Sequence, residues 1–528
     1  MVSINMDSSN NNVKILIATW GNLFQWEETK YEVDIDGDLK SCDKTNSTTC
    51  CLVETYRPDL VLIFIPDTLL CRSSKEGKSI EDYGVKPKDR KSYEDALKKL
   101  YEDVDSRITS WKGCDFLNNP DKEHKNIIAI APGNGVYKCF SKNKELTVMW
   151  SSRNLGIDPL SYYSSYLLLK SFIETIRYLD NIFANDKPVE IELLMDTSHG
   201  INYMPIALRR TIYVLARILS SYYNVNVKII HFNSDPYVKG VKKLAIHKVL
   251  EENINPNKAV QRLVYSYLLE FKGLMPRGNL GKYKNLDEDL KRIKSLFKII
   301  VSTIHYSMPL AHLYFYGEIL DGTEYDVSDK SSFLNKLLDT FNEFARDMVY
   351  LVKINLVDNN EYIISRSVGV DYDSIKSALS SLAIARYSMF SYKLLGKKDY
   401  REGFSLKDLK KILDERLKGP LYHVADHEIS QFERYIKDSS LKGEYRELID
   451  KACTHRGKWE DAEKNCNNVI RVLIAHGGLS LRDIKVMWKN GELILAYKEE
   501  CIENIKRLLK RSLKDTYKLI VSGREKTM

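Results

Sequence analysis

The chain has 528 residues, of which 44% are hydrophobic and 29% are charged, and its formal net charge is +8 at pH 7. This composition excludes a largely disordered chain, the length allows about two to four domains, and the mild positive charge permits a nucleotide or nucleic-acid partner without requiring one. No apolar run approaches the roughly 20 residues that cross a bilayer, and the first residues, MVSINMDSSNNN, lack the features of a secretory signal, so we expect a cytoplasmic protein with no membrane partner.

The first 240 residues alternate between strands and helices. Apolar runs predict strands over 13–22, 59–68, 126–135, 189–200 and 225–236. The run 59–68, DLVLIFIPDT, is almost continuously apolar, as expected for a strand covered on both faces. Helical stretches over 162–179 and 205–222 lie between them. This alternation predicts βαβ units and an α/β fold with a parallel, doubly wound sheet.

Each of the five predicted strands runs into a turn rich in polar residues or glycine: TWGN, PDT, PGNG, DTSHGIN and NSDP. In open parallel sheets, ligands bind in the crevice outside the carboxyl ends of the strands. We therefore expect a binding site where these five turns converge.

The chain after Lys243 is mostly helical, with amphipathic helices expected over 258–274, 289–306 and 332–354. Residues 362–372 predict a short strand or an irregular insert. A long helix is expected over 459–476 and is ended by Gly477-Gly478. A β-hairpin over 484–497, with Asn490-Gly491 as its turn, follows this helix. A basic helix over 502–513 comes last.

We therefore expect an α/β domain over 1–243 and a mostly helical domain with a small β-hairpin over 244–528. The segment 344–442 is placed in the second domain by default, as part of it or as an insertion in it.

The nine cysteines form no CxxC pair and no zinc-ligand spacing beside histidine. In a long chain without a secretory signal, scattered cysteines are typical of reduced, structural thiols. We expect reduced thiols and no metal site.

Two common nucleotide-binding motifs are absent. The GxGxxG fingerprint of dinucleotide cofactors should follow the first strand, but TWGNLFQW has one glycine, and PGNGVYKCF lacks the third glycine and follows a later strand. The Walker A pattern is also missing. An NAD-dependent oxidoreductase and an ATPase are therefore disfavoured.

The turn DTSHGINYMP has the features of a phosphate or nucleotide cradle. Gly200 permits a close backbone approach, Pro205 suits the first turn of a helix, and the backbone N–H groups at that helix start favour an anion. His199 and Asn202 can hydrogen-bond a base, a ribose or a phosphate. The alternative is a well-capped connection between strand and helix with a solvent-facing histidine.

The motifs ILIATWGN, PGNG and DTSHGINYMP resemble the sensor domain of the CARF–HEPN ribonucleases of type III CRISPR systems. The resemblance implies a Rossmann-like CARF sensor that dimerises and binds a cyclic oligoadenylate across the two-fold axis, with cyclic tetra-adenylate as allosteric activator and no other cofactor. A symmetric ring suits a two-fold axis because each subunit presents the same surface. The residues that the resemblance places at the ligand are Thr19, Trp20, Gly21, Asn22, Gly133, Asn134, Gly135, Asp196, Ser198, His199, Gly200, Ile201 and Asn202.

The same family joins the sensor to a HEPN nuclease marked by an arginine and a histidine four to six residues apart. This chain offers RVLIAHGG, with Arg471 and His476. Arg416 and His423 fit a looser spacing, but Gly419-Pro420 between them cannot run through a regular helix. We therefore choose Arg471 and His476 as the candidate catalytic pair.

On an ideal helix Arg471 lies opposite an apolar stripe that includes Leu473, and His476 lies about 140° from it. The pair can converge only because His476 precedes two glycines, where the chain can leave helical geometry. The same helix of a second subunit is the expected partner surface for Arg471. The family often has Asn directly after the arginine. This chain has Val472, and Asn467 or Asn468 is the candidate replacement.

The resemblance implies metal-independent cleavage of single-stranded RNA through attack of the 2′-hydroxyl, which leaves a 2′,3′-cyclic phosphate and a 5′-hydroxyl. His476 would act as general acid or base, and Arg471 would stabilise the charge on the phosphorane.

We expect a homodimer or a larger assembly of dimers. Slow cleavage of the ring by the sensor, assisted by Ser198 and His199, is disfavoured. Two alternatives stay open: a ligand-gated transcription regulator, and an inactive sensor protein in which Arg471 and His476 are structural.

Overall fold

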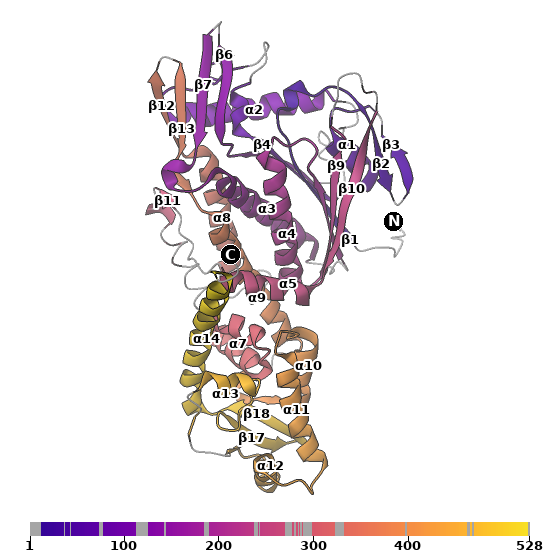
Figure 1. Ribbon diagram of the computed structural model, residues 1–528, viewed down its shortest axis with the longest axis vertical. Helices are drawn as coiled ribbons and strands as arrows, with labels where there is room; N and C mark the ends of the chain where they lie inside the picture. The colour runs from indigo at the N-terminus through magenta and orange to yellow at the C-terminus, as the bar shows by residue number, and fades with distance from the viewer. Residues whose placement is uncertain are drawn as a thin grey trace, which may run out of the picture.

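The computed structural model is elongated, with an α/β region at one end and a mostly helical region at the other (Figure 1). It describes residues 12–35, 37–42, 44–72, 78–111, 114, 125–141, 144–183, 190–236, 241, 243–269, 277–278, 281–283, 285, 288, 298–322, 332–358, 360–396, 399–461, 465–466 and 469–525.

Five parallel strands form the centre of the α/β region, in the order β9-β8-β1-β4-β5. All five strands predicted from the sequence are confirmed. β4 is buried along its whole length, as its continuous apolar run indicates. The bounds are β1 (Asn12–Thr19), β4 (Leu60–Pro66), β5 (Lys125–Ala131), β8 (Glu190–Asp196) and β9 (Asn226–Ser234).

Three further strands extend this sheet beyond β9, in the order β10-β2-β3. β10 (Lys243–Ile254) pairs antiparallel with β9 and parallel with β2 (Lys30–Ile35), and β2 pairs antiparallel with β3 (Asp38–Ser41). The sheet is therefore mixed rather than wholly parallel. The sheet also continues past the domain boundary expected between residues 243 and 244, because β10 pairs with β9 as far as Ile254.

Helices connect and cover the strands. α1 (Thr48–Tyr56) lies between β1 and β4 in the chain, and α2 (Arg90–Thr109) lies between β4 and β5. α3 (Pro159–Phe183) and α4 (Tyr203–Tyr223) pack against each other and against the parallel strands. α9 (Tyr372–Lys393) packs on α3 and α4 as a further layer (Figure 1).

A second sheet joins two segments that are distant in the chain. β6 (Gly135–Ser141) and β7 (Lys144–Ser151) form a hairpin, β7 pairs parallel with β13 (Glu361–Arg366), and β13 pairs antiparallel with β12 (Val352–Asp358). α8 (Ser332–Tyr350) leads into β12 and packs on α3. The first part of the segment 344–442, placed by default in the second domain, therefore pairs with strands of the α/β region.

The helical region contains α5 (Pro256–Leu269), α7 (Pro309–Gly322), α10 (Leu406–Arg416), α11 (Tyr422–Lys437), α12 (Glu444–Thr454) and α14 (Glu499–Glu525). The predicted hairpin is confirmed as β17 (Ile484–Lys489) and β18 (Glu492–Tyr497). Asn490 and Gly491 have φ values of 54° and 81°, which the tight turn requires. Short strands complete the fold: β11 (Arg277–Gly278), β14 (Val368–Gly369), β15 (Phe404–Ser405) and β16 (Glu460–Asp461).

The long helix predicted over 459–476 is wrong. Among the residues of this stretch that the structure describes, only α13 (Ile470–Ala475) is an α-helix. β16 pairs with β17 instead, and Cys466 forms a disulfide with Cys501 at the start of α14. Pairing with a distant hairpin and a covalent link thus override a periodicity that indicated a helix.

The expectation of reduced thiols is also wrong. Eight of the nine cysteines form four disulfides, and Cys453 is free. Their Cα–Cα separations of 5.2–5.6 Å lie within the range that a disulfide needs. Spacing in the sequence gave no sign of this, since the partners are up to 68 residues apart. The pairs are Cys42–Cys51, Cys50–Cys114, Cys71–Cys139 and Cys466–Cys501.

No helix within the described ranges is both long enough and apolar enough to cross a membrane. Among the same residues, no group of three or more His, Cys, Asp or Glu side chains is arranged to hold a metal ion.

Candidate functional site

The predicted turns meet at the carboxyl edge of the parallel strands. The Gly21 N–H donates to the carbonyl of His199 over 2.8 Å, which joins the turn after β1 to the turn after β8. A Cβ atom added to Gly200 would lie 3.0 Å from Oγ1 of Thr19 and 2.6 Å from the ring of Pro205. This close approach explains why glycine stands at position 200.

Asp196, at the end of β8, serves as an internal anchor. Its carboxylate accepts hydrogen bonds from the hydroxyls of Thr48 and Thr49 at 2.8 and 2.7 Å and from the Ser198 N–H at 3.0 Å. The residue is 1% exposed. Asp196 therefore fixes the start of α1 against the turn.

His199 presents its ring to the start of α1. Nε2 accepts a hydrogen bond from the Thr48 N–H at 3.0 Å, and the ring lies 4.2 Å from the ring of Trp26. Burial lowers the pKa of His199 to about 4, against a smaller opposing influence of Asp196. The imidazole is therefore neutral at pH 7, and its acceptor nitrogen is occupied within the protein.

Trp20 lies in the core rather than at an exposed surface. Its side chain is fully buried, its indole N–H donates to Oγ1 of Thr49 at 2.8 Å, and its ring contacts the rings of Trp26 and Trp111. The buried indole of Trp20 therefore fixes the TWGN turn against the start of α1.

The rest of the DTSHGIN turn is more open. Ser198 accepts a hydrogen bond from the Ser234 N–H through its hydroxyl, and Ile201 packs over Gly21. Asn202 is exposed, has φ 35° and ψ −83°, and makes no side-chain cap on α4. A non-glycine residue at positive φ is uncommon, and such residues cluster at functional sites. The Asn202 side chain is free to meet a ligand.

The PGNG loop holds a buried amide without a partner. Asn134 is 5% exposed, and within the described residues neither its Nδ2 nor its Oδ1 has a hydrogen-bond partner. Oγ1 of Thr19 and Oδ1 of Asn22 are also buried and unpartnered there. Buried polar atoms without partners cost about 1–3 kcal/mol each and call for an explanation. These atoms lie at or just after the carboxyl ends of β1 and β5, the two strands that flank β4, and buried polar atoms left open at that edge are typical of a ligand site.

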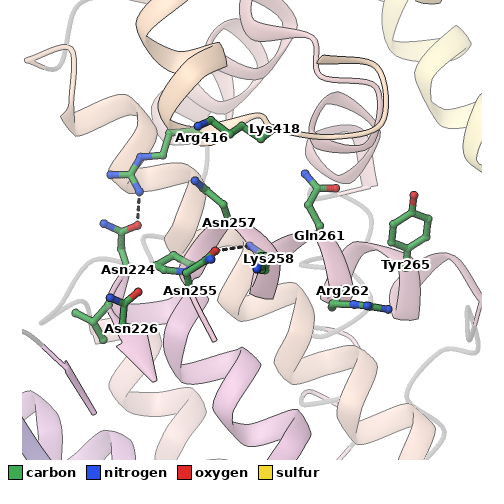
Figure 2. A pocket seen from close by; sticks show the side chains of 12 residues that line it. Asn224, Asn226, Asn255, Asn257, Lys258, Gln261, Arg262, Tyr265, Arg416 and Lys418 are labelled. Carbon is green, nitrogen blue, oxygen red and sulfur yellow. Dashed lines mark hydrogen bonds between the residues drawn. The ribbon is translucent and has the colours of Figure 1, made fainter. Parts of the chain in front are cut away.

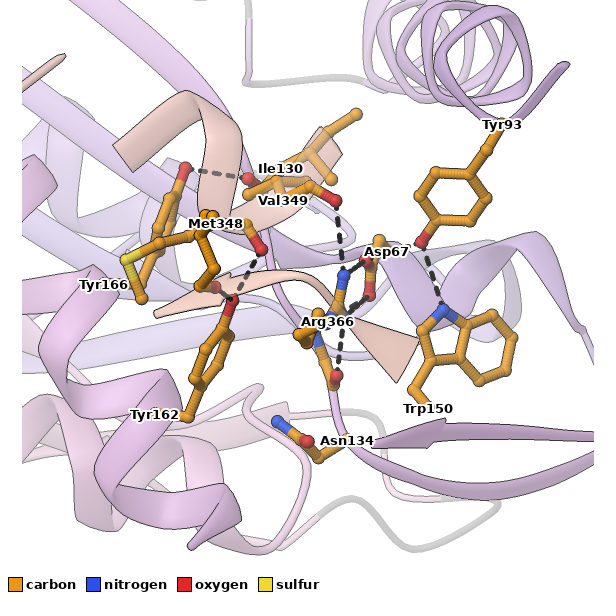
Figure 3. Close-up of polar contacts among 12 residues, drawn as sticks. Asp67, Tyr93, Ile130, Asn134, Trp150, Tyr162, Tyr166, Met348, Val349 and Arg366 are labelled. Carbon is orange, nitrogen blue, oxygen red and sulfur yellow. Dashed lines mark hydrogen bonds and ion pairs between the residues drawn. The ribbon is translucent and has the colours of Figure 1, made fainter. Parts of the chain in front are cut away.

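A buried ion pair fixes this loop, and the sequence analysis missed it. Arg366 of β13 pairs with Asp67, which follows β4, at 2.7 Å, and both side chains are fully buried (Figure 3). Arg366 also donates to the carbonyls of Gly133, at 2.7 Å, and Val349. Asp67 in turn accepts from the Gly133 N–H at 2.8 Å. An apolar residue pattern around position 366 gave no signal of a partner about 300 residues earlier.

Arg471 and His476 lie at the two ends of α13, in the helical region. Arg471 is exposed. His476 directly follows the helix, and its side chain is 41% exposed. Gly477 and Gly478 have φ values of 53° and 79°, so the chain leaves helical geometry directly after His476, as predicted.

Glu428 of α11 orients His476, and the sequence analysis did not identify it. Oε1 of Glu428 lies 3.2 Å from Nδ1 of His476, and the carboxyl group is 9% exposed. Tyr445 donates its hydroxyl to the other oxygen of Glu428. Burial, reinforced by this hydrogen bond, raises the pKa of Tyr445, so the hydroxyl keeps its proton. A carboxylate only accepts, so in a neutral imidazole at this contact Nδ1 is the donor to Glu428 and Nε2 is the acceptor nitrogen.

Two further predictions concern this site. Asn467 and Asn468 lie outside the described residues. The rejected pair is separated as expected: Arg416 ends α10, Gly419 and Pro420 lie in the connection, and His423 is the second residue of α11.

Comparisons with known proteins agree with the resemblance noted in the sequence. Residues 15–236 match the family model described as "CRISPR system endoribonuclease Csx1, CARF domain". The chain is 25% identical over 509 residues to the CRISPR system endoribonuclease Csx1 of Methanocaldococcus jannaschii, covering 92% of this chain and 90% of that protein.

Among solved structures, Enterococcus italicus Csm6 bound to cyclic hexa-2′-fluoro-hexa-dAMP aligns over 95% of this chain and 93% of that chain. The identity is 12% and the TM-score is 0.21, so this likeness carries no argument. The family match and the related sequence support the resemblance without it. Over residues 15–236, the chain is therefore similar to the CARF domain of the CRISPR endoribonuclease Csx1.

Proposed function

We propose that the protein is an endoribonuclease of type III CRISPR defence that cleaves single-stranded RNA without a metal ion when its CARF domain binds a cyclic oligoadenylate. The sensor is the carboxyl edge of the parallel strands, and the nuclease is a HEPN-type site at Arg471 and His476. The 25% identity to a Csx1 endoribonuclease extends over 92% of the chain and therefore includes both parts.

The observation that carries the catalytic proposal is the contact between His476 and Glu428. A base held by a carboxylate through one ring nitrogen, with the other nitrogen directed away, has the geometry of general acid–base catalysis. The contact spans 3.2 Å, and the imidazole is 41% exposed, which leaves room for a substrate. The exposed guanidinium of Arg471 on the same short helix supplies the positive charge.

In the proposed reaction, Nε2 of His476 takes the proton of the ribose 2′-hydroxyl. The 2′-oxygen then forms a bond to the adjacent phosphorus, and the bond from phosphorus to the 5′-oxygen breaks. The leaving 5′-oxygen takes up a proton, from a second imidazole or from water, which gives a 2′,3′-cyclic phosphate and a 5′-hydroxyl. Arg471 stabilises the extra charge on the phosphorane oxygens. DNA lacks the 2′-hydroxyl and is spared.

The sensor proposal is supported by the unpartnered polar atoms of Thr19, Asn22 and Asn134. A ring that draws these groups into hydrogen bonds relieves their cost and thereby favours the conformation that binds it. We propose cyclic tetra-adenylate as this activator. Asn202, exposed at the start of α4, supplies a further contact.

Arg366 offers a physical connection from the sensor to the rest of the chain. It bonds the carbonyl of Gly133 in the ligand loop and that of Val349 at the end of α8. A ligand that displaces the loop changes this contact, and with it the position of α8. We propose that ring binding acts on the nuclease through this contact.

We propose a homodimer, or a larger assembly of dimers, with the ring on the two-fold axis. Ile206, in the first turns of α4, is 62% exposed, and Val136, directly after the PGNG loop, is also 62% exposed. Exposed apolar side chains beside a ligand site are typical of a contact surface.

We also propose that the protein is located in the cytoplasm. The four disulfides are compatible with this location, since disulfide-rich intracellular proteins occur in hyperthermophilic archaea and bacteria.

The test is cleavage of a labelled single-stranded RNA with and without cyclic tetra-adenylate and cyclic hexa-adenylate, in buffer containing EDTA. We expect cleavage only with a ring, 2′,3′-cyclic phosphate ends by mass spectrometry, and no cleavage of DNA of the same sequence. His476→Ala should abolish cleavage while the affinity for the ring persists. Ring binding without cleavage would favour the regulator or the inactive sensor instead.

A further inference from the structure

A large cavity lies where the α/β region meets the helical region. Its volume is about 1030 Å³, large enough for a substantial ligand. Asn226 begins β9, and Asn255 directly follows β10, which runs antiparallel to β9. The cavity therefore lies at the amino edge of the parallel strands, opposite the edge that carries the candidate ring site.

The lining is cationic and rich in amides, and the lining residues include no carboxylate. Lys258 and Arg262 come from α5, and Arg416 and Lys418 come from the end of α10 and the chain after it (Figure 2). Five amide side chains complete the polar lining: Asn224, Asn226, Asn255, Asn257 and Gln261. Glu252 and Asp414, whose charges act on nearby groups, lie outside the lining.

Several of these side chains are already held in place. Arg416 bonds the side chain of Asn224, and Asn257 donates to the carbonyl of Glu415 at 3.0 Å. These bonds join the end of α4 and the start of α5 to the end of α10. The cavity wall is therefore braced from both regions.

Gln261 is different, because both its amide nitrogen and its amide oxygen are buried and have no partner within the described residues. Figure 2 shows Gln261 and Tyr265 projecting from α5 toward the side on which Arg416 and Lys418 lie. Tyr265 is 38% exposed, so part of its ring is available to a ligand. Cations, an unpartnered amide and an exposed aromatic ring are the kinds of group that bind single-stranded nucleic acid: cations for phosphates, an amide for base edges and a ring for stacking.

The chain connects the cavity to the helix that contacts the candidate catalytic histidine. Lys418 lies four residues before α11 begins at Tyr422, and Glu428, which contacts His476, lies on the same helix. From Tyr422 to Glu428 the helix rises about 9 Å, at 1.5 Å per residue. A strand bound at Lys418 thus needs to pass the connection from Lys418 to Tyr422 and less than two turns of α11 to come level with Glu428.

We propose that this cavity binds the sugar-phosphate backbone of the single-stranded RNA substrate and guides the strand to His476. This inference rests on the proposed ribonuclease function. It assigns substrate binding to Lys258, Arg262 and Lys418, at a place separate from the ring site.

The test is the affinity for a labelled single-stranded RNA of about 16 nucleotides, near the upper site size of single-strand binding domains. All variants carry His476→Ala so that the RNA stays intact, and fluorescence anisotropy is read over a range of salt concentrations. Lys258→Glu with Arg262→Glu should raise the Kd at least about tenfold. The slope of log affinity against log salt should become shallower by about 1.4, because each phosphate that the protein no longer neutralises reduces the slope by about 0.7. Lys418→Glu should give about half that change in slope.

The matched control is Lys407→Glu with Lys411→Glu, which reverses two exposed lysines of α10 outside the lining. Circular dichroism and cyclic tetra-adenylate binding check that each variant is folded. If the cavity variant binds RNA as tightly as the control variant does, the inference is overturned. If RNA affinity falls as expected but the parent protein never cleaves RNA with a ring present, RNA binding by the cavity is supported and the proposed catalytic function is contradicted.

Discussion

The two candidate sites are built in opposite ways. At the sensor edge, Asp196 and His199 are bonded within the protein and hold the turn against α1, while buried atoms of Thr19, Asn22 and Asn134 have no partner among the described residues. At the nuclease site, Arg471 is exposed, His476 is partly exposed, and Glu428 constrains the histidine. A turn in which the fold requires several residues, as it does Asp196, His199 and Gly200, leaves a long motif in the sequence. A site that requires two accessible groups leaves a short one.

This contrast gives the first prediction, which has the largest expected effect. Arg366→Leu leaves the charge of Asp67 buried and unpaired, and we expect it to destabilise the sensor by about 3–5 kcal/mol. Denaturant unfolding followed by tryptophan fluorescence measures this, because the Trp20, Trp26 and Trp111 rings cluster in the sensor.

The matched control is Arg177→Leu, which breaks another Arg–Asp pair whose partner, Asp339, is 76% exposed. We expect its effect to stay below about 1 kcal/mol. Equal losses of stability in the two variants would mean that the sensor edge does not depend on its buried network.

The second prediction concerns the open site. Arg471→Ala should lower the rate of RNA cleavage by about 10²–10³-fold, the usual loss when a group that stabilises transition-state charge is removed. The free energy of unfolding should change little, because Arg471 is exposed. Single-turnover cleavage with saturating ring measures the rate, and Arg456→Ala, another exposed arginine, is the control. If Arg471→Ala lowered the free energy of unfolding as much as Arg366→Leu does, the nuclease site would depend on buried contacts as the sensor edge does, and the two sites would not differ.

The third prediction tests the positioning role of Glu428. Glu428→Gln places an amide at Nδ1 of His476 and weakens the preference for the reactive tautomer, so kcat should fall by about 10- to 100-fold. KM should stay unchanged, because the carboxyl group is only 9% exposed. Tyr445→Phe removes one bond to Glu428 and should have a smaller effect of the same kind.

Glu433→Gln makes the same chemical change on the same helix and serves as the control. An unchanged kcat in Glu428→Gln would show that the contact with His476 is only structural.

The sequence predicted the parallel strands and their polar ends because those features depend on local patterns. Apolar runs of strand length and glycines at close approaches, such as Gly200, are visible in any single segment. The sequence did not predict Arg366, Glu428 or the four disulfides. Each of these depends on two segments that meet only in the folded chain.

The false prediction of a long helix before His476 has the same cause. The periodicity of residues 459–476 indicated a helix, but pairing of β16 with β17 and the link between Cys466 and Cys501 decided the structure. The helix end itself was predicted correctly, because Gly477 and Gly478 determine it locally. Local chemistry thus located His476, and tertiary contacts decided what surrounds it.

The last prediction, with the smallest expected effect, returns to the sensor and uses pH. The pKa of His199 in the folded protein is about 4, below the usual value of 6.5. Its contribution to stability is therefore complete above pH 6.5 and is lost as the pH falls toward 4, because the unfolded chain binds the proton first. Between pH 6.5 and 5.5 this loss amounts to about 1 kcal/mol. His199→Gln keeps an acceptor for the Thr48 N–H but cannot be protonated, so the loss should disappear.

Unfolding curves at pH 7 and pH 5.5 measure the difference for the parent and for His199→Gln. His247→Gln, which replaces a histidine that is 56% exposed, is the matched control and should keep the pH dependence of the parent. An identical dependence in the parent and in His199→Gln would mean that His199 is open to solvent. In that case the polar groups of the turn would be directed at the ligand rather than at the fold, and the two sites would be built alike.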